Sequence, residues 1–343
     1  MHKELKNPFL KTRLIPFMAS IVKTENGTID VGNYELTSAV NTGTDGSLIS
    51  PVQQFNRGSV FVGSSYGSSQ KGYQPYLAST SASKSSFDVV LRTDETAATT
   101  ASGAITGVVI GNDSDLTDYV KKGWSIVKTP RSACRVILGQ INTSTTTINI
   151  GSAFTITKNA TGDVTVTFKR EFFTDDVIAV GTSVTTNKYV NIHSTSRSSL
   201  RIQLCNASNA LADGILNFIV FGYDGSANQN LRKPISVPLI KPRLIYGAVD
   251  SDKTTILYGS GGFTAASGGT GKTVITLTDS FAAEPIVVAT PVAGRTSILS
   301  SSTSASGFTI ATHNYAQSLT DKAAHFLAIG SDASGSTEFY IAT

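Results

Sequence analysis

The chain has 343 residues, enough for two or three ordinary domains, and 15% of them are charged, against about 25% in a typical protein. The net charge of +4 is small for this length and forms no basic stripe, so the sequence lacks the electrostatic footprint of a nucleic-acid-binding protein. No apolar run approaches the ~20 residues that cross a bilayer, and we find no secretory leader. We therefore expect synthesis in a cytoplasm and no membrane insertion.

The first predicted element is a charged N-terminal arm over residues 1–12, which is either an anchor to a partner or a disordered tail. An extended apolar run from Leu14 to Phe17 follows it. A basic start that ends in Arg precedes this run and two later ones. The three starts are Lys11-Thr12-Arg13, Lys128-Thr129-Pro130-Arg131 and Lys241-Pro242-Arg243. This recurrence indicates an internal repeat.

Two further strings recur in the same order, with a spacing of about 110 residues, which is typical of a repeated domain. A Thr-Ile-x-x-Gly string ends at Gly32, Gly151 and Gly259. An apolar triplet is followed by Gly, any residue and Asp, and its glycines are Gly111, Gly222 and Gly330. These ordered signals predict a tandem array of three homologous domains.

The centre of each repeat has the clearest strand signal. In the second repeat, Val164, Val166 and Phe168 alternate with threonines, and the run from Val274 to Thr278 does nearly the same in the third. Alternation with period two describes a strand with one buried face. We therefore expect an all-β fold of three tandem antiparallel β-sandwich domains of similar fold. The predicted domains are residues 13–114, 128–225 and 241–343.

The segments between the domains differ in character. Residues 115–127 are predicted to be a short linker helix, because Ser114 can cap a run in which Leu116, Tyr119 and Val120 share one face. Residues 226–240 are polar and contain two prolines, so we expect an extended linker there. Within the later two domains, a phenylalanine after the central strand is expected to plug the end of the sandwich. These residues are Phe172 and Phe281.

The motifs that resemble catalytic or binding chemistry have structural explanations. The run from Gly268 to Thr273 is similar to the end of a phosphate-binding loop, but Ala266 stands where the first glycine is required and a strand pattern follows. We expect a hairpin turn there. The four histidines have no metal-ligand spacing, and Cys134 and Cys205 are either a disulfide or, as we favour, two buried thiols. We expect no enzyme activity, no metal and no cofactor.

The third repeat resembles the H-type lectin module over about 70 residues. The resemblance lies in the strand Val274 to Leu277, Phe281 with Glu284 to Val288, Gly307 to Ile310, and the closing run Phe326 to Gly330. The second repeat follows the pattern more loosely and the first follows it least. Modules of this kind are six-stranded antiparallel sandwiches that assemble as trimers or pairs of trimers, in lectins and, as tandem arrays, in bacteriophage fibres and spikes. The sugar site of the lectins uses a Trp-containing string, and this chain has Thr312-His313-Asn314-Tyr315 there, without the Trp.

The resemblance and the Ser/Thr-rich, low-charge composition point to a structural protein of a bacteriophage virion: a tail or head fibre, a spike or a capsid decoration. We expect three sandwiches in series to form a rod, which associates as a homotrimer and attaches to other virion proteins through its N-terminal arm. The third domain is then placed to contact a host-surface glycan through Arg295, His313, Asn314 and Tyr315. The alternative is a multivalent carbohydrate-binding protein of the lectin type.

Overall fold

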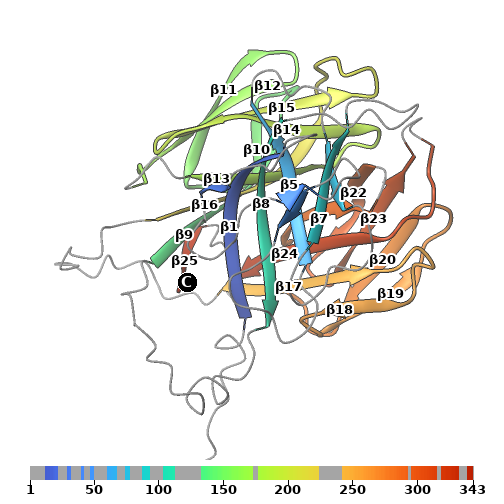
Figure 1. Cartoon of the computed structure of the whole chain (residues 1–343). Helices are drawn as coiled ribbons and strands as arrows, with labels where there is room; N and C mark the ends of the chain where they lie inside the picture. Colours follow the sequence, from blue (N-terminus) through green and yellow to red (C-terminus); the bar gives the residue numbers. More distant parts are fainter. Residues whose placement is uncertain are drawn as a thin grey trace, which may run out of the picture.

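Strands are the regular secondary structure of every described part of the chain. The computed structural model describes residues 12–21, 29–31, 40–41, 47–49, 60–67, 74–77, 87–92, 103–112, 133–172, 177–223, 242–292, 295–314, 318–331 and 338–342. These residues form several sheets whose strands are mostly antiparallel, which confirms an all-β chain (Figure 1). The predicted linker helix at 115–127, the linker at 226–240 and arm residues 1–11 lie outside the described residues.

The strands fall into three sets of eight, which we call the first, second and third repeats. The first comprises β1 (Thr12–Ile21), β2 (Ile29–Val31), β3 (Val40–Asn41), β4 (Ser47–Ile49), β5 (Val60–Tyr66), β6 (Gln74–Leu77), β7 (Phe87–Arg92) and β8 (Gly103–Asn112). The second comprises β9 (Ala133–Asn142), β10 (Thr147–Ile150), β11 (Phe154–Ala160), β12 (Asp163–Phe168), β13 (Ile178–Ser183), β14 (Lys188–Thr195), β15 (Ser199–Asn206) and β16 (Ile215–Tyr223). The third comprises β17 (Pro242–Val249), β18 (Ile256–Gly259), β19 (Phe263–Ser267), β20 (Lys272–Leu277), β21 (Ile286–Pro291), β22 (Arg295–Ser304), β23 (Gly307–His313) and β24 (Ala324–Ser331).

The same strand order recurs in each repeat. We call β2-β1-β8-β5, β10-β9-β16-β13 and β18-β17-β24-β21 the inner sheets, and β3-β4-β7-β6, β11-β12-β15-β14 and β19-β20-β23-β22 the outer sheets. A parallel pairing of β5 with β14 joins the inner sheet of the first repeat to the outer sheet of the second. The last strand, β25 (Glu338–Ala342), pairs with β9 and so ties the end of the chain to the second repeat.

The outer sheets follow the predicted alternation. In β12, Val164, Val166 and Phe168 are buried while Thr167 is exposed. Their side chains pack against inner-sheet residues such as Ile137 in the core of the second repeat. The corresponding core of the third repeat contains Ile245, Phe263, Ile275, Phe308 and Phe326. Burial of one face of each outer strand explains why the Val/Thr alternation identified these strands correctly.

Strands such as β13, β21 and β24 of the inner sheets are buried on both faces, and this accounts for the closing apolar triplets. In the second repeat, Val220 packs in the core of its own repeat, while Ile219 and Phe221 face a cluster that all three repeats share. Each repeat contributes side chains to this shared core. Its members include Val60, Val62, Val108, Ile110, Val136, Leu138, Ile178, Val180, Ile219, Phe221, Tyr246, Ile286, Val288, Leu327 and Ile329. A strand buried on both faces reads as a continuous apolar run.

The shared core corrects the expectation of a rod of domains in series. Because inner-sheet residues of all three repeats pack together, the repeats surround one core (Figure 1). In Figure 1 the second repeat lies at the top in green and yellow, the third at the lower right in orange and red, and the blue strands β1 and β5 of the first cross between them. A rod would expose the second apolar face of each inner sheet to water, at a cost of about 25 cal/mol for each Å² of apolar surface.

One end of each later sandwich is closed by an Arg–Phe–Gly stack. The Phe172 ring fills the space beside Gly222, where an added Cβ would lie 2.3 Å from Cδ1 of the ring, and the Arg135 guanidinium lies 4.0 Å from the ring centroid. Arg243 stands 4.1 Å from the Phe281 centroid in the same way. Both rings are buried, as predicted for residues that plug the sandwich.

The register corrects one part of the sequence alignment. Arg135 pairs with Gly222 as Arg243 pairs with Gly330, whereas the basic starts in the sequence align Arg131 with Arg243. Arg13 pairs with Gly111 in the first repeat. The misassignment arose because Arg131 has the Lys and Pro neighbours of the other starts, while the partner that defines the position is a glycine far along the chain.

Candidate functional site

A set of side-chain hydrogen bonds between distant parts of the chain lies where one repeat meets the next. In each inner sheet, one Ser or Thr occupies the same position: Ser64 in β5, Thr182 in β13 and Thr290 in β21. The strand registers establish the equivalence. Each of the three residues comes directly after a Gly or Ala, in a strand that pairs with β8, β16 or β24 respectively. Each of these hydroxyls binds the backbone of the next repeat.

The three hydroxyls make the same pair of hydrogen bonds in a closed cycle. Ser64 Oγ accepts from the Gly181 N–H at 2.9 Å and donates to the Gly181 carbonyl at 3.1 Å. Thr182 Oγ1 does the same with Ala289, at 2.9 and 3.2 Å. Thr290 Oγ1 does so with Gly63, at 2.9 and 3.4 Å, and thereby joins the third repeat to the first. We call these three junctions the seams.

A second residue reinforces every seam from the neighbouring strand. It is Thr106, Asn217 or His325, the direct cross-strand partner of Ser64, Thr182 or Thr290 respectively. Thr106 Oγ1 donates to the Ala179 carbonyl at 2.5 Å, and Asn217 Nδ2 donates to the Val287 carbonyl at 3.0 Å. The Phe61 N–H donates to His325 Nδ1 at 3.2 Å. Each seam therefore contains two side chains that bind two backbone sites separated by one residue on the next repeat.

His325 differs from its counterparts because it can be charged. Its side chain is fully buried, and this burial lowers its pKa from 6.5 to about 3. Since Nδ1 accepts from the Phe61 N–H, the proton of the neutral ring lies on Nε2, which is 2.9 Å from Tyr258 Oη. Burial also raises the pKa of Tyr258 above its ordinary value. The ring thus has a partner at both nitrogens while it remains neutral.

A small polar cavity of about 30 Å³ lies beside the three hydroxyls. Ser64, Thr182 and Thr290 line it together with Gly63, Gly181 and Ala289, and Tyr189 also contributes to its wall. A cavity of this size and polarity can hold one or two water molecules. It therefore fits hydration of the seams rather than binding of a larger ligand.

The seam between the first and second repeats has further polar contacts. Ser65 Oγ donates to Asn191 Oδ1 at 2.8 Å, and Asn191 Nδ2 in turn donates to Gln203 Oε1 at 3.2 Å. Gln203 Nε2 donates to Asp163 at 2.7 Å, and Arg201 binds both oxygens of the Asp163 carboxylate. This chain of contacts extends from the first repeat across the outer sheet of the second.

Asp163 is the most strongly bound acidic side chain of that chain of contacts. Burial would raise its pKa, but hydrogen bonds from Arg201, Asn159 and Gln203 outweigh this effect and lower the pKa to about 2. Asp163 is therefore an ionised carboxylate that accepts hydrogen bonds from Arg201, Asn159 and Gln203. It has a structural role in holding β11, β12 and β15 together.

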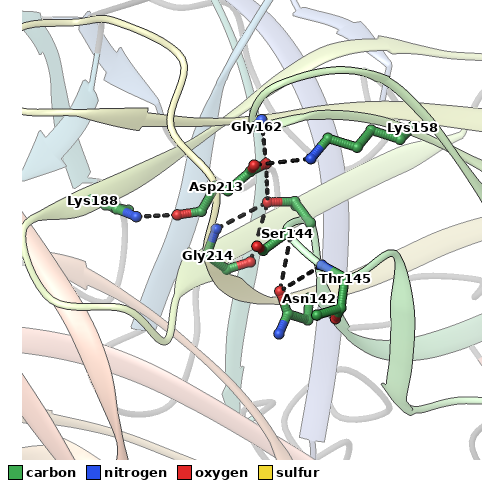
Figure 2. Close-up of polar contacts among 9 residues, drawn as sticks. Asn142, Ser144, Thr145, Lys158, Gly162, Lys188, Asp213 and Gly214 are labelled. Carbon is green, nitrogen blue, oxygen red and sulfur yellow. Dashed lines mark hydrogen bonds and ion pairs between the residues drawn. The ribbon is translucent and has the colours of Figure 1, made fainter.

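A second carboxylate fastens one end of the second repeat (Figure 2). Asp213 accepts from the Gly162 N–H at 2.7 Å and forms an ion pair with Lys158 at 2.9 Å, while Lys188 donates to the Asp213 carbonyl. Asp321 makes the same contacts in the third repeat, with Gly271 and Lys253. In both repeats the Asp holds the hairpin turn between the first two strands of the outer sheet.

The structure brings together three of the four residues predicted to bind a glycan. Arg295 begins β22 and is the cross-strand neighbour of His313, and Asn314 follows directly. His313 is buried, and Asn314 fastens its own loop, since its side chain accepts from the Ser318 N–H and its N–H donates to the Ser318 carbonyl. Tyr315 lies outside the described residues.

The second repeat has the same loop geometry. Its bridge between Cys205 and Leu211 matches the bridge between His313 and Leu319, and Asn206 caps its loop through Ser208 and Ala210. The placements of His313 and Asn314 are therefore features of the shared fold. Cys205 is fully buried in β15, and Cys134 lies in β9 of the other sheet.

The look-alike of a phosphate-binding loop is a hairpin turn, as predicted. It joins β19 to β20, with the Gly268 N–H bound to the Lys272 carbonyl and the Lys272 N–H bound to the Gly269 carbonyl. Within the described ranges, no group of three or more His, Cys, Asp or Glu side chains is placed to hold a metal ion. The same ranges contain no helix long and apolar enough to cross a bilayer.

Sequence reasoning missed the seam residues, although they leave a signal. Three apolar residues, then Gly or Ala, then Ser or Thr occur at the same position of each repeat. The strings are Val60-Phe61-Val62-Gly63-Ser64, Ile178-Ala179-Val180-Gly181-Thr182 and Ile286-Val287-Val288-Ala289-Thr290. In a chain this rich in Ser and Thr, each string alone is an ordinary strand end.

No family model, no curated protein and no solved structure matches this chain.

Proposed function

We propose that this chain is a structural protein of a bacteriophage virion, a fibre, spike or decoration, in which three β-sandwich domains form a trimer within a single chain. The domains are residues 13–114, 128–225 and 241–343. The observation that carries the proposal is the closed cycle of hydroxyl bonds, in which each repeat makes the same contact with the next and the third returns to the first. A closed cyclic contact is the hallmark of a ring assembly.

The closed cycle of contacts agrees with the resemblance of the sequence to the H-type lectin module. Modules similar to the H-type lectin domain assemble as trimers, and three of them on one chain can supply such a trimer from a single copy. The homotrimer of chains expected from the sequence is then unnecessary. The side chains of the seams serve to hold backbone in place, which suits a structural role: six of them bind main-chain groups of the next repeat.

The N-terminal arm and the third repeat have separate roles in this assignment. The N-terminal arm, residues 1–12, anchors the ring to other virion proteins. The third repeat adjoins the first across a seam. It is therefore not at the far end of a rod from the arm. Contact with a host-surface glycan is proposed for the start of β22 and the loop after β23, through Arg295, Asn314 and Tyr315.

Particles purified on a density gradient test the proposal when probed with an antibody raised against the full-length chain. We expect the protein to sediment with intact particles and to be lost when residues 1–12 are deleted. Protein that remains in the soluble fraction while it binds a glycan array would contradict the virion assignment and favour the lectin alternative. Within the virion reading, the paired variants Tyr315→Ala and Arg295→Ala should reduce adsorption to host cells while particle incorporation is unchanged.

A further inference from the structure

The three seams are not equivalent in the way the chain connects them. The first and second repeats, and the second and third, are consecutive in the sequence. The third and first repeats are joined by the bonds of Thr290 to Gly63, 227 residues apart, and by the bond between His325 and Phe61, 264 residues apart. We call this junction the closing seam. It is the one at which the ring can open without unfolding a repeat, because no consecutive segment of chain holds it shut.

The closing seam is also the one that contains a titratable side chain at the reinforcing position. Thr106 and Asn217 occupy this position at the other seams, and neither changes charge between pH 3 and 8. His325 is fully buried between β17, β21, β5 and β18. One seam of three is therefore built to respond to acid.

The described strands packed against His325 contain no acidic side chain that could act as a counter-ion to a charged ring. On β18, Tyr258 is in contact with the ring. On β17, Arg243 stacks over Phe281 and Tyr246 packs in the shared core. On β5, Tyr66 packs against the core of the second repeat, and the residues of β21 include no ionisable side chain. A charged imidazole would thus be buried without a counter-ion among these elements.

We propose that His325 is an acid-sensitive clasp, and that its protonation opens the ring at the closing seam. In the neutral ring, Nδ1 accepts the Phe61 N–H. A proton on Nδ1 would place two donors face to face and remove this bond, and the charge would remain in an apolar site until the seam opened to water. The proton is taken from solvent, and the reverse transfer closes the seam again when the pH rises.

The pH range of opening follows from linkage. In the closed seam, burial lowers the pKa of His325 to about 3. In an open, solvated seam, its pKa returns to the ordinary value of 6.5. Below pH 6.5 the open form therefore binds a proton that the closed form excludes. The equilibrium constant for opening rises by up to about tenfold for each pH unit between 6.5 and 3. The Thr290 bond does not titrate and opposes opening at every pH.

Hydrogen–deuterium exchange on the full-length protein tests the clasp, with rates corrected at each pH for the intrinsic exchange of unstructured peptides. We expect peptides of β5 and β24 to lose protection by about tenfold per pH unit below 6.5. Peptides of β13 and β16, which form the seam between the second repeat and its neighbours, should keep theirs. Loss of protection at the same pH in all strands would indicate global unfolding and overturn the proposal, as would protection of β5 that does not depend on pH.

Two variants identify the residue responsible. His325→Asn installs the side chain that the second repeat uses at this position, and it should flatten the pH dependence of β5 protection. Asn217→His is the matched exchange, and it should move acid sensitivity to the seam between the second and third repeats. If His325→Asn retains the full acid response of the wild type, the clasp is wrong. If it does not fold, the wild-type pH series and Asn217→His still decide the question.

Discussion

Thr290 and Gly63 are 227 residues apart in the sequence, yet the Thr290 hydroxyl binds both main-chain groups of Gly63, at 2.9 and 3.4 Å. This is the contact that closes the ring of three repeats. A hydroxyl suits the position because it can accept from the N–H and donate to the C=O of a single residue. The three seam hydroxyls thereby bind the N–H and C=O groups of Gly63, Gly181 and Ala289. These backbone groups point away from the neighbouring strand of their own sheet and would otherwise be buried without partners.

Removal of one seam hydroxyl should destabilise the whole chain. Thr182→Val keeps the shape of the side chain but leaves the Ala289 N–H and its carbonyl without their partner in a buried site. We expect a loss of about 1–3 kcal/mol in the free energy of unfolding, measured by urea denaturation at neutral pH. Thr167→Val on the exposed face of β12 is the control and should change stability by less than about 0.5 kcal/mol. Equal effects of the two substitutions would show that the seam hydroxyls are not important to stability.

The Phe172 ring should make the closing glycine of the second repeat intolerant of any side chain. A Cβ at position 222 would lie 2.3 Å from Cδ1 and 2.6 Å from Cε1 of Phe172. Gly222→Ala is therefore expected to cost about 1–3 kcal/mol, because the ring and the guanidinium of Arg135 above it must shift together.

A double-mutant cycle separates this clash from a general effect of alanine. Phe172→Leu shortens the side chain that meets the new methyl group, so the double variant should be more stable than the sum of the two single changes predicts. Strict additivity of the two substitutions would contradict the contact.

Acid should weaken the protein in two overlapping pH ranges. The pKa of His325 is lowered on folding, so its unfolded form gains a proton first, and stability falls by up to about 1.4 kcal/mol per pH unit below 6.5. The pKa of Asp163 is also lowered, from 3.8 to about 2, so its contribution is complete above pH 3.8 and is lost as the pH falls through 2. This second loss amounts to about 2 kcal/mol.

Urea midpoints measured at intervals from pH 7.5 to 2.5 would resolve both ranges. Asp163→Asn should lower stability at pH 7, because Arg201 loses its two-point partner, and should reduce the additional loss of stability below pH 3.8 while the decline from pH 6.5 remains. A single transition common to the wild type, Asp163→Asn and His325→Asn would contradict the assignment of either group.

The hairpin turn of the second repeat should loosen when its carboxylate is removed. Asp213 holds the Gly162 N–H and Lys158, and Asp213→Asn would weaken both contacts without changing the size of the side chain. We expect faster amide exchange in the hairpin of β11 and β12, with no change in the corresponding hairpin of β19 and β20, where Asp321 is intact. Equal acceleration in both hairpins would mean that Asp213 acts on the fold as a whole.

The sequence predicted the features whose cause lies within one repeat. The alternation of Val164, Val166 and Phe168, the turn at Gly268 and the burial of Phe172 all reflect local periodicity or turn chemistry. The shared core could be anticipated in part, because continuous triplets such as Ile219 to Phe221 mark strands that are buried on both faces. What periodicity cannot specify is which surface covers the second face.

The ring itself was beyond sequence reasoning because its bonds join residues at least 70 positions apart. Ser64 and Thr182 are common residue types in a Ser/Thr-rich chain, and their partners are backbone groups, which leave no mark on the side-chain pattern. Arg135 was missed for the same reason, since its place is set by Gly222 on the paired strand and not by its neighbours. His313 and Asn314 were proposed for their chemistry, and their burial and loop-capping contacts depend on loop geometry that composition does not reveal.

The arrangement of the three repeats around one core is tested most directly by small-angle X-ray scattering of the full-length chain at neutral pH, coupled to light scattering that identifies the species of 36.0 kDa. For a chain of 343 residues closed into a ring, we expect a radius of gyration of about 20 Å and a single compact distance distribution. A radius at least half as large again, with separate maxima for domains in series, would show that the repeats form a rod and would contradict the shared core.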